Sequence, residues 1–183
     1  MTRLTASRLD VPAVITTARL RLVESDPAWA PQFAAAMAAS SDSLRFTPGW
    51  REAAQPSVAA ASLQTSLDRA ADDVVRHAFV GDTYVARIDL HSWDDEVPKC
   101  ELGYVANAAI LGHGLVTEAC QTMIDIAWSM GVVRVQAVCD SRNERAIRMA
   151  ERLGMRREGV LRHNDRDEAG SLVDEVILAI TRG

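Results

Sequence analysis

Long apolar runs are missing from this 183-residue sequence. No stretch approaches the roughly 20 residues that cross a bilayer, and the first residues lack the hydrophobic region of a secretion signal. Aromatic residues are also scarce, at 5%. The missing apolar run argues against a membrane protein, and the missing signal region argues against a secreted protein. We therefore expect a cytoplasmic protein with no membrane partner.

Cysteine is scarce as well, and its pattern excludes two kinds of structural site. Only Cys100, Cys120 and Cys139 are present, widely spaced and in apolar surroundings. An odd number at such spacing fits neither a disulfide framework nor a zinc site. We expect three small core residues in a reducing compartment and no bound metal.

An excess of positive charge is the third absence. The 20 Lys and Arg against 25 Asp and Glu give a formal net charge of -5, which argues against a nucleic-acid-binding protein. An amine or a basic peptide end suits an acidic protein better. The length and the 48% hydrophobic content are those of one globular domain. We predict an irregular lead-in over 1–15 and a single domain over 16–183.

Hydrophobic periodicity predicts an α+β domain with a mixed sheet rather than a regular βαβ array. The expected strands are 16–23, 74–80, 83–90, 99–106, 133–139, 155–161 and 172–180. The expected helices run from Asp26-Pro27 to about Ser40, over 58–71, over 115–130, and from a capping box at Ser141-x-x-Glu144 to Leu153.

A glycine stretch separates the strand at 99–106 from the firmest helix. It reads Gly112-His113-Gly114 directly before the helix that begins at Leu115. Glycine there lets the main chain turn and point N–H groups at a ligand beside a helix N-terminus, as in a phosphate site. The stretch lacks the Lys-Ser/Thr of a Walker loop and has no G-x-G-x-x-G. Taken alone, it fits a phosphate cradle or a plain tight turn.

The glycine stretch belongs to a set of four motifs: Glu101-Leu102-Gly103-Tyr104-Val105, the G-H-G-L-V-T-E-A stretch from Gly112, Asn143-Glu144-Arg145-Ala146 and Leu153-Gly154-Met155. In order and spacing they resemble the acetyl-CoA signatures of the GNAT superfamily of N-acetyltransferases. Three more motifs are Thr17-Ala18-Arg19-Leu20-Arg21-Leu22, Thr47-Pro48-Gly49-Trp50 and Glu158-Gly159-Val160-Leu161-Arg162. They resemble the RimJ/RimL-like branch of that superfamily, which acetylates N-terminal amines of ribosomal proteins. The resemblance covers nearly the whole chain after about Thr16.

The resemblance implies a GNAT-like fold, in which a mostly antiparallel, mixed sheet splays between its fourth and fifth strands and is flanked by helices. Coenzyme A would lie in that opening, with acetyl-CoA as cosubstrate. The implied cofactor-binding residues are the main chain of Tyr104, Val105 and Ala106 for the pantetheine arm, Asn143 nearby, and the backbone N–H groups of Leu111, Gly112, His113, Gly114, Leu115, Val116 and Thr117 for the pyrophosphate.

The sequence departs from this family pattern at four positions. Leu111 stands where most members have Gln or Arg, and Val116 where they have Gly or Ala. Ala146 stands where RimJ/RimL relatives often have Ser, and Ala150 where other members place Tyr. No obvious general acid remains there. A coenzyme A-binding protein with weak or no catalysis is therefore an alternative to an active enzyme.

Acetyl transfer to an amine requires the amine to lose a proton and the oxyanion to be stabilised. Glu101 is the candidate base, acting directly or through a water, and the backbone N–H of Val105 is the candidate oxyanion donor. A thiol with a pKa near 8.5 leaves largely unaided. Glu101 has a structural alternative, a cross-strand pair with an Arg such as Arg87. Direct attack in a ternary complex is the expected mechanism.

Several further features have both a functional and a structural interpretation. Asn143 fits a helix cap as well as a cofactor ligand, and His91 beside Asp89 fits either an acceptor-site residue or a solvated one. Arginines of the segment 142–157 fit a solvated helix face or contacts to the 3′-phosphate of the cofactor. An acidic rim at 94–96 would suit a basic acceptor. The acceptor is a protein N-terminal amine or a small amine such as an antibiotic, amino acid or polyamine. A homodimer is plausible by resemblance.

Overall fold

The computed structural model describes residues 7–47 and 49–182, so the first six residues of the predicted lead-in and Pro48 of the predicted turn lie outside it. Its centre is an eight-stranded sheet of order β1-β2-β3-β4-β5-β6-β8-β7. The strands are β1 Val14–Thr16, β2 Arg21–Val23, β3 Val74–Val80, β4 Thr83–Asp94, β5 Lys99–Ala106, β6 Arg134–Asp140, β7 Arg156–Arg166 and β8 Leu172–Thr181. The helices are α1 Ala30–Ala38, α2 Pro56–Asp68, α3 Leu115–Ser129 and α4 Glu144–Arg152, with short 3-10 turns between some of them.

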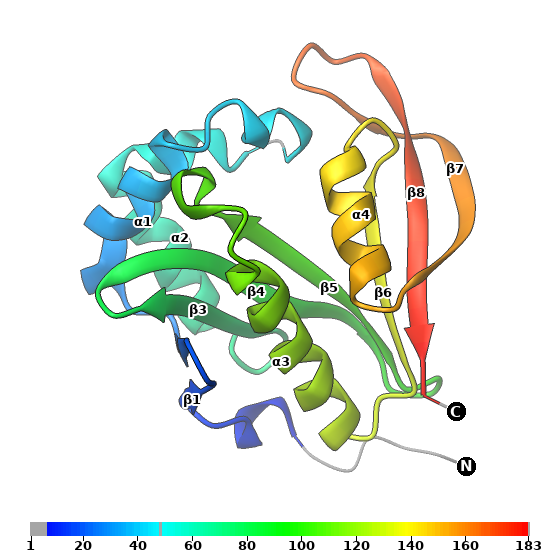
Figure 1. Cartoon of the computed structure of the whole chain (residues 1–183), viewed down its shortest axis with the longest axis horizontal. Coiled ribbons are helices and arrows are strands. Elements are labelled where there is room, and N and C mark those ends of the chain that lie inside the picture. The colour runs from blue at the N-terminus through cyan, green and yellow to red at the C-terminus, as the bar shows by residue number, and fades with distance from the viewer. Residues whose placement is uncertain (1–6, 48, 183) are drawn as a thin grey trace.

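The sheet splays between β5 and β6, which are its one parallel pair among the described strands. They pair at only three positions, from Lys99 opposite Arg134 to Glu101 opposite Gln136. Beyond Glu101 the two strands diverge, and Figure 1 shows the resulting V, closed near the C-terminus and open at the other end. The predicted mixed, mostly antiparallel and splayed sheet is confirmed. The splay falls between the fifth and sixth strands because β1 adds a strand that the sequence did not predict.

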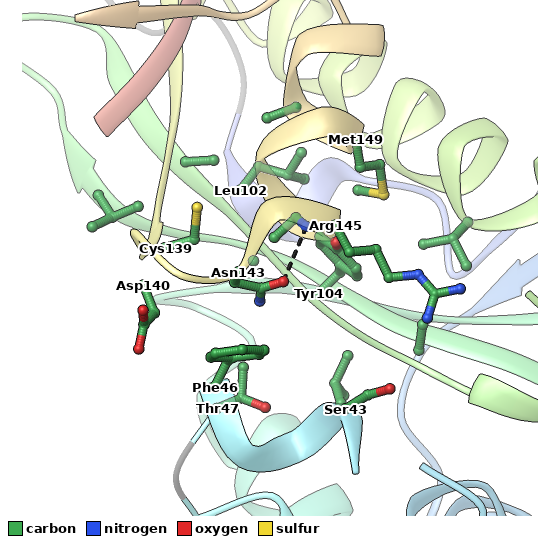
Figure 2. A pocket seen from close by; sticks show the side chains of 18 of the residues that line it. Ser43, Phe46, Thr47, Leu102, Tyr104, Cys139, Asp140, Asn143, Arg145 and Met149 are labelled. Carbon is green, nitrogen blue, oxygen red and sulfur yellow. Dashed lines mark hydrogen bonds between the residues drawn. The ribbon is translucent and has the colours of Figure 1, made fainter. Parts of the chain in front are cut away.

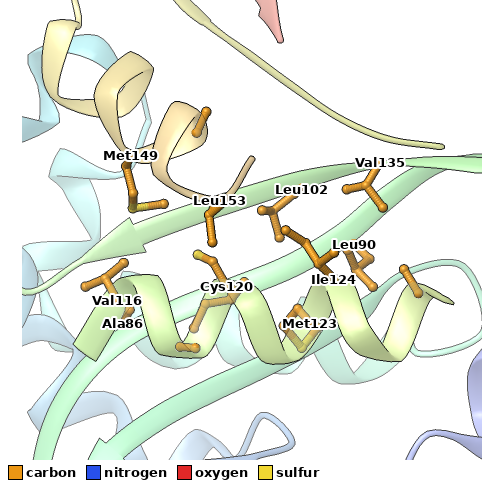
Figure 3. Packing of buried hydrophobic residues seen from close by; sticks show 14 of the residues in the cluster. Ala86, Leu90, Leu102, Val116, Cys120, Met123, Ile124, Val135, Met149 and Leu153 are labelled. Carbon is orange, nitrogen blue, oxygen red and sulfur yellow. The ribbon is translucent and has the colours of Figure 1, made fainter. Parts of the chain in front are cut away.

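Helices cover both faces of the sheet and bury two cores. On one face α3 packs Cys120, Met123 and Ile124 against sheet residues such as Leu90 and Leu102, with α4 beside it (Figure 3). On the other face α1 and α2 enclose an aromatic cluster around Phe33, Phe79 and Tyr84. No helix in residues 7–47 and 49–182 is long and apolar enough to cross a bilayer.

The predicted strand over 16–23 is wrong, because the chain turns back on itself there. β1 and β2 form a short hairpin around Thr17, whose N–H donates to the Leu20 carbonyl at 2.9 Å. The Leu20 N–H donates to Thr17 Oγ1, also at 2.9 Å. A Thr side chain that bonds nearby main chain competes with a continuous strand. Glu118 on α3 reinforces the turn, since its carboxylate accepts from Thr17 Oγ1 at 2.5 Å and from Arg19 Nε at 2.6 Å.

Two other predictions also need correction. The cap of α4 is Asn143 rather than Ser141, because Asn143 Oδ1 accepts from the Ala146 N–H at 3.1 Å. The Ser141 N–H instead donates to the Asp174 carbonyl at 2.9 Å. The strand predicted over 155–161 extends into the predicted polar link, where β7 reaches Arg166, whereas β8 begins at Leu172 as predicted. Every residue of β7 is exposed, so this strand needs no apolar alternation and periodicity could not reveal its length.

Candidate active site

A cleft of about 1030 Å³ occupies the opening between β5 and β6. One side is formed by β5 and the glycine stretch before α3, and the other by β6 and the start of α4. Figure 2 shows Tyr104, Cys139 and Asn143 lining this space, with Phe46 and Thr47 facing them from the segment after α1. The tip of the β7–β8 hairpin completes the open end through residues 165–167.

The glycine stretch has the backbone shape of an anion cradle. Gly112 has φ 98° and Gly114 has φ 74°, values that an L side chain rarely adopts. The first bond of α3 runs from the Glu118 N–H to the Gly114 carbonyl at 3.0 Å. Within the described residues, the N–H groups over 111–117 have no acceptor from the protein. They remain free for a ligand at the positive end of a 15-residue helix.

Side chains hold this loop from behind. Arg19 donates from one terminal nitrogen to the His113 carbonyl at 2.8 Å and from Nε to Glu118 at 2.6 Å. His113 consequently lies behind the loop and does not line the cleft, whereas the other residues over 111–117 do. The atypical Leu111 and Val116 both contribute to the core under α3. The core under α3 therefore accommodates these two side chains.

The open edge of β5 presents main chain to the cleft. The Val133 N–H donates to the Pro98 carbonyl at 2.8 Å, so Pro98 faces β6. At the far end the Asn107 N–H donates to the Val85 carbonyl at 2.9 Å, so Asn107 faces β4. Peptide groups of a strand point alternately to its two sides. Beyond Glu101, where β5 separates from β6, the even-numbered residues of β5 therefore direct their peptide groups into the opening.

This alternation decides which N–H groups are accessible. Tyr104 and Ala106 direct their peptide groups into the opening, and the Ala106 carbonyl already accepts from Ser40 Oγ at 3.0 Å. Val105 lies opposite Arg87 in the antiparallel pair and directs its N–H toward β4. The register thus favours the N–H of Tyr104 or Ala106 over that of Val105 as a donor to a bound ligand.

Asn143 lines the cleft and caps α4 at the same time. Its Oδ1 accepts the Ala146 N–H, the dashed line in Figure 2. The structural interpretation of this side chain is therefore confirmed. Its amide nitrogen remains a possible donor to a ligand in the cleft.

Five of the six arginines in the segment 142–157 fall into two groups. Arg142 pairs with Asp140 at 2.6 Å, and Arg148 and Arg157 pair with glutamates of α4. Arg145 and Arg152 instead line the cleft, and neither forms an ion pair with a described residue. These two guanidinium groups are available to a phosphate at the α4 side of the cleft.

A row of polar side chains crosses the vertex of the V on the face that carries α1 and α2. Arg87, Asp89 and His91 alternate along β4, and Arg87 forms an ion pair with Asp89. His91 Nδ1 lies 2.8 Å from Asp89 Oδ2, a close but poorly aligned contact. On β5, Glu101 Oε2 accepts from Gln136 Nε2 at 3.2 Å. The suggested pair between Glu101 and Arg87 is therefore wrong.

Burial and neighbouring charges shift two pKa values in this row. Burial alone would raise the pKa of Asp89, but His91 and Arg87 together hold it below its ordinary value. The carboxylate of Asp89 raises the pKa of His91, against the opposing effect of burial, and Glu101 adds to the increase. The two side chains thus stabilise each other in their charged forms.

Gly103 makes room for this arrangement. It lies opposite Asp89 in the β4–β5 register. A Cβ at Gly103 would lie 3.1 Å from both carboxylate oxygens of Asp89 and 3.2 Å from His91 Cε1. The missing side chain is what lets the carboxylate and the imidazole lie flat over β5.

Two expectations about other residues change. Cys100 and Cys120 are buried as predicted, but Cys139 is half-buried and lines the cleft. Burial raises the pKa of the Cys139 thiol to about 11, so the thiol is neutral at physiological pH. The acidic residues 94–96 lie outside the cleft at the β4–β5 turn, where Asp94 pairs with Lys99 at 3.3 Å. They form no rim around an acceptor in this cleft.

Sequence reasoning missed the spatial role of the charged row on β4. The signal was present, because Arg87, Asp89 and His91 are spaced i, i+2 and i+4 in an otherwise apolar strand. Such spacing places all three on one face of the strand. Gln136 carried no signal, since only the contact between β5 and β6 brings it to Glu101.

Solved structures share this fold. The microcin C7 self-immunity acetyltransferase MccE, in complex with acetyl-CoA and AMP, has a TM-score of 0.85 at 18% identity, covering 94% of this chain and 98% of that one. RimL, a ribosomal protein α-N-acetyltransferase in complex with coenzyme A, has a TM-score of 0.81 at 15% identity, covering 92% and 97%. A protein of T. thermophilus, assigned only in general terms as an acetyltransferase, has a TM-score of 0.79 at 27% identity, covering 93% and 89%.

Sequence comparison identifies the family. No curated protein matches the chain, but the acetyltransferase (GNAT) domain matches residues 19–156. That region contains the cradle, the splayed strands and the polar row. The chain therefore belongs to the GNAT acetyltransferase family and is an acyltransferase that uses acetyl-CoA.

Proposed function

We propose that this enzyme acetylates a protein N-terminal α-amine by direct attack in a ternary complex. The observation that carries the proposal is the splay of β5 from β6, which exposes main chain and the carboxylate of Glu101 in one cleft. Odd-numbered side chains of β5, such as Glu101, face the side of α1 and α2, whereas Leu102 packs under α3. Acetyl-CoA and the amine would thus approach from opposite faces of the sheet.

Acetyl-CoA would be held mainly by main chain. The free N–H groups over 111–117 and the N-terminus of α3 would bind its pyrophosphate, with Arg145 and Arg152 near its phosphates. The pantetheine arm would lie along the open edge of β5, beside Tyr104 and Ala106, as an added strand does. The Asn143 amide would donate to the same arm.

Glu101 would accept the proton of the amine. A primary amine is mostly protonated at neutral pH, so the reaction requires a base near the attacking nitrogen. The hydrogen bond from Gln136 fixes Oε2 of Glu101, and Oε1 accepts no hydrogen bond from a described residue. The oxyanion would be stabilised by the N–H of Tyr104 or Ala106, because the register turns that of Val105 away.

Two observations support a peptide amine as the acceptor. The open end of the cleft lies between the segment after α1 and the β7–β8 hairpin, and Arg51 and Glu168 join the two at 3.1 Å. Both residues are partly exposed, so this contact opens at little cost and admits an extended chain end. RimL, which shares the fold, acts on a ribosomal protein. MccE shares it too, which makes a small amine the second candidate.

An acceptor panel tests this proposal. We expect acetyl-CoA to raise the melting temperature and peptides with free N-termini to release coenzyme A. Reaction with polyamines or amino acids but not with peptides would assign the enzyme to small amines. Binding of acetyl-CoA with no release for any amine would indicate a non-catalytic protein.

The base is tested separately by Glu101→Gln. The variant should lower turnover by roughly 10²-fold or more with the affinity for acetyl-CoA retained. Asp94→Asn is the matched control, since it removes a carboxylate from the same pair of strands outside the cleft. An unchanged rate in Glu101→Gln would reject Glu101 as the base.

A further inference from the structure

We infer that His91, oriented by Asp89, is a positioning residue that receives the amine proton from Glu101 and passes it to solvent. The inference rests on the proposed role of Glu101 as base. His91 Nε2 lies 3.7 Å from Glu101 Oε1, on the side of the carboxylate that is not fixed by Gln136. The two residues are direct cross-strand partners.

Asp89 determines which imidazole nitrogen faces Glu101. Its carboxylate lies 2.8 Å from Nδ1, and although the two groups are poorly aligned for a hydrogen bond, the negative charge favours a proton on that nitrogen and leaves Nε2 as the proton acceptor. Arg87 holds Asp89 from the other side, and Gly103 leaves both side chains room to lie against β5. A distance of 3.7 Å is slightly longer than a hydrogen bond, and contacts between catalytic groups often tighten when substrate binds.

The charges around the ring allow it to take up a proton. Asp89 on its own strand and Glu101 on β5 are the acidic groups nearest to it, and Asp73 beyond α2 adds a weaker attraction. Asp73 is itself paired with Arg69 at 2.9 Å. All of these raise the pKa of His91, against the opposing effect of burial. The side chain is 32% exposed, which provides the exit to solvent.

The proton balance of the relay is simple. The amine nitrogen loses a proton to Glu101 Oε1 as its lone pair attacks the acetyl carbon. The proton then passes from Oε1 to Nε2, which restores the Glu101 carboxylate and forms an imidazolium beside Asp89. Release of that proton to solvent returns both groups to their starting state.

The pH dependence of kcat at saturating amine tests the relay. A residue that must be unprotonated to act gives an acid limb, in which kcat rises with pH. Asp89→Asn should move this limb to lower pH, because it removes the charge that raises the pKa of His91. His91→Gln should lower kcat by on the order of 10-fold to 10²-fold and abolish the His91 limb. Asp94→Asn should leave the profile unchanged.

Chemical rescue separates the relay from a structural role. Free imidazole should restore part of the turnover of His91→Ala and none of that of Glu101→Gln. Lower kcat in His91→Gln and Asp89→Asn with an unmoved acid limb and no rescue would overturn the relay. If Glu101→Gln still lowers the rate in that case, the proposed base stands while the relay fails. An unaffected Glu101→Gln would reject the base itself.

Discussion

Acid should destabilise the protein through one buried histidine. His77 on β3 is fully buried, with Nε2 at 2.9 Å from Ser25 Oγ and Nδ1 at 2.8 Å from the Tyr84 hydroxyl. Burial, aided by the charge of Arg87, lowers the pKa of His77 to about 3. The ring is therefore neutral in the folded protein at every pH at which the protein is handled.

The size of the effect follows from this shift. In the unfolded chain the same histidine binds a proton below its ordinary pKa of 6.5. The stability that the neutral ring contributes is fully present above pH 6.5 and is lost as the pH falls toward 3. Each pH unit in that window costs about 1.4 kcal/mol. The free energy of unfolding should thus be about 2 kcal/mol lower at roughly pH 5 than at roughly pH 7.

The other buried groups with shifted pKa values act mainly outside the range from about pH 5 to pH 6.5. Asp89 and Asp140 have lowered pKa values, so their contributions are lost only as the pH falls below their ordinary value of 3.8. His91 has a raised pKa, so its contribution is complete below pH 6.5 and is lost only as the pH rises through the folded value. Between pH 6.5 and about pH 5, the change in stability should come mainly from His77.

Urea denaturation followed by tryptophan fluorescence measures this change. His77→Gln should be less stable than the wild type near neutral pH but should lose little further stability at the lower pH. His113→Gln is the control, because it removes an exposed histidine and should follow the wild type. If His77→Gln loses the same stability as the wild type between the two values of pH, the argument from burial is refuted.

Two glycine substitutions test the site itself. In Gly103→Ala the new Cβ would press on the Asp89 carboxylate at 3.1 Å, which should cost about 1–3 kcal/mol of stability and reduce turnover; Gly159→Ala, with nothing within 4 Å of its Cβ, should do neither. Full turnover in Gly103→Ala would show that the positions of Asp89 and His91 are unimportant. In Gly112→Ala the alanine would have to adopt φ 98°, which costs about 1–2 kcal/mol. The variant should bind acetyl-CoA more weakly, as measured by titration calorimetry. Gly81→Ala is the control, because Gly81 lies at a hairpin tip with φ 55°, so the variant should be strained but keep its affinity for acetyl-CoA. Equal affinities for acetyl-CoA in the two variants would argue against the cradle.

The sequence was most informative where a regular apolar period ends at a glycine. β3 has the predicted bounds and ends directly before Gly81, and α3 begins at the predicted residue after Gly114 and ends one residue early. The hairpin around Thr17 was missed because the bonds that stabilise it include contacts to Glu118, about a hundred residues away. Periodicity cannot report such a contact, nor the length of a strand exposed on both faces.

The same limit applies to the site. The residues of the cradle could be proposed from their order in the sequence, and those that line the cleft include every proposed site residue except His113. The direction of the Val105 N–H could not be predicted from the sequence, because it depends on which residue pairs of β4 and β5 are hydrogen-bonded. The contact of His91 with Glu101 depends on the same register.

The free N–H groups over 111–117 also have a practical meaning for redesign. Any L-amino acid other than proline supplies the same donor, so a cradle of this kind tolerates most side-chain exchanges that keep the backbone angles. That tolerance fits a fold shared at 18% identity with a TM-score of 0.85. A mutational library over this loop should therefore be permissive except at its glycines and at Leu111 and Val116, which pack into the core. To change the acyl donor, an engineer would have to reshape the backbone rather than replace side chains.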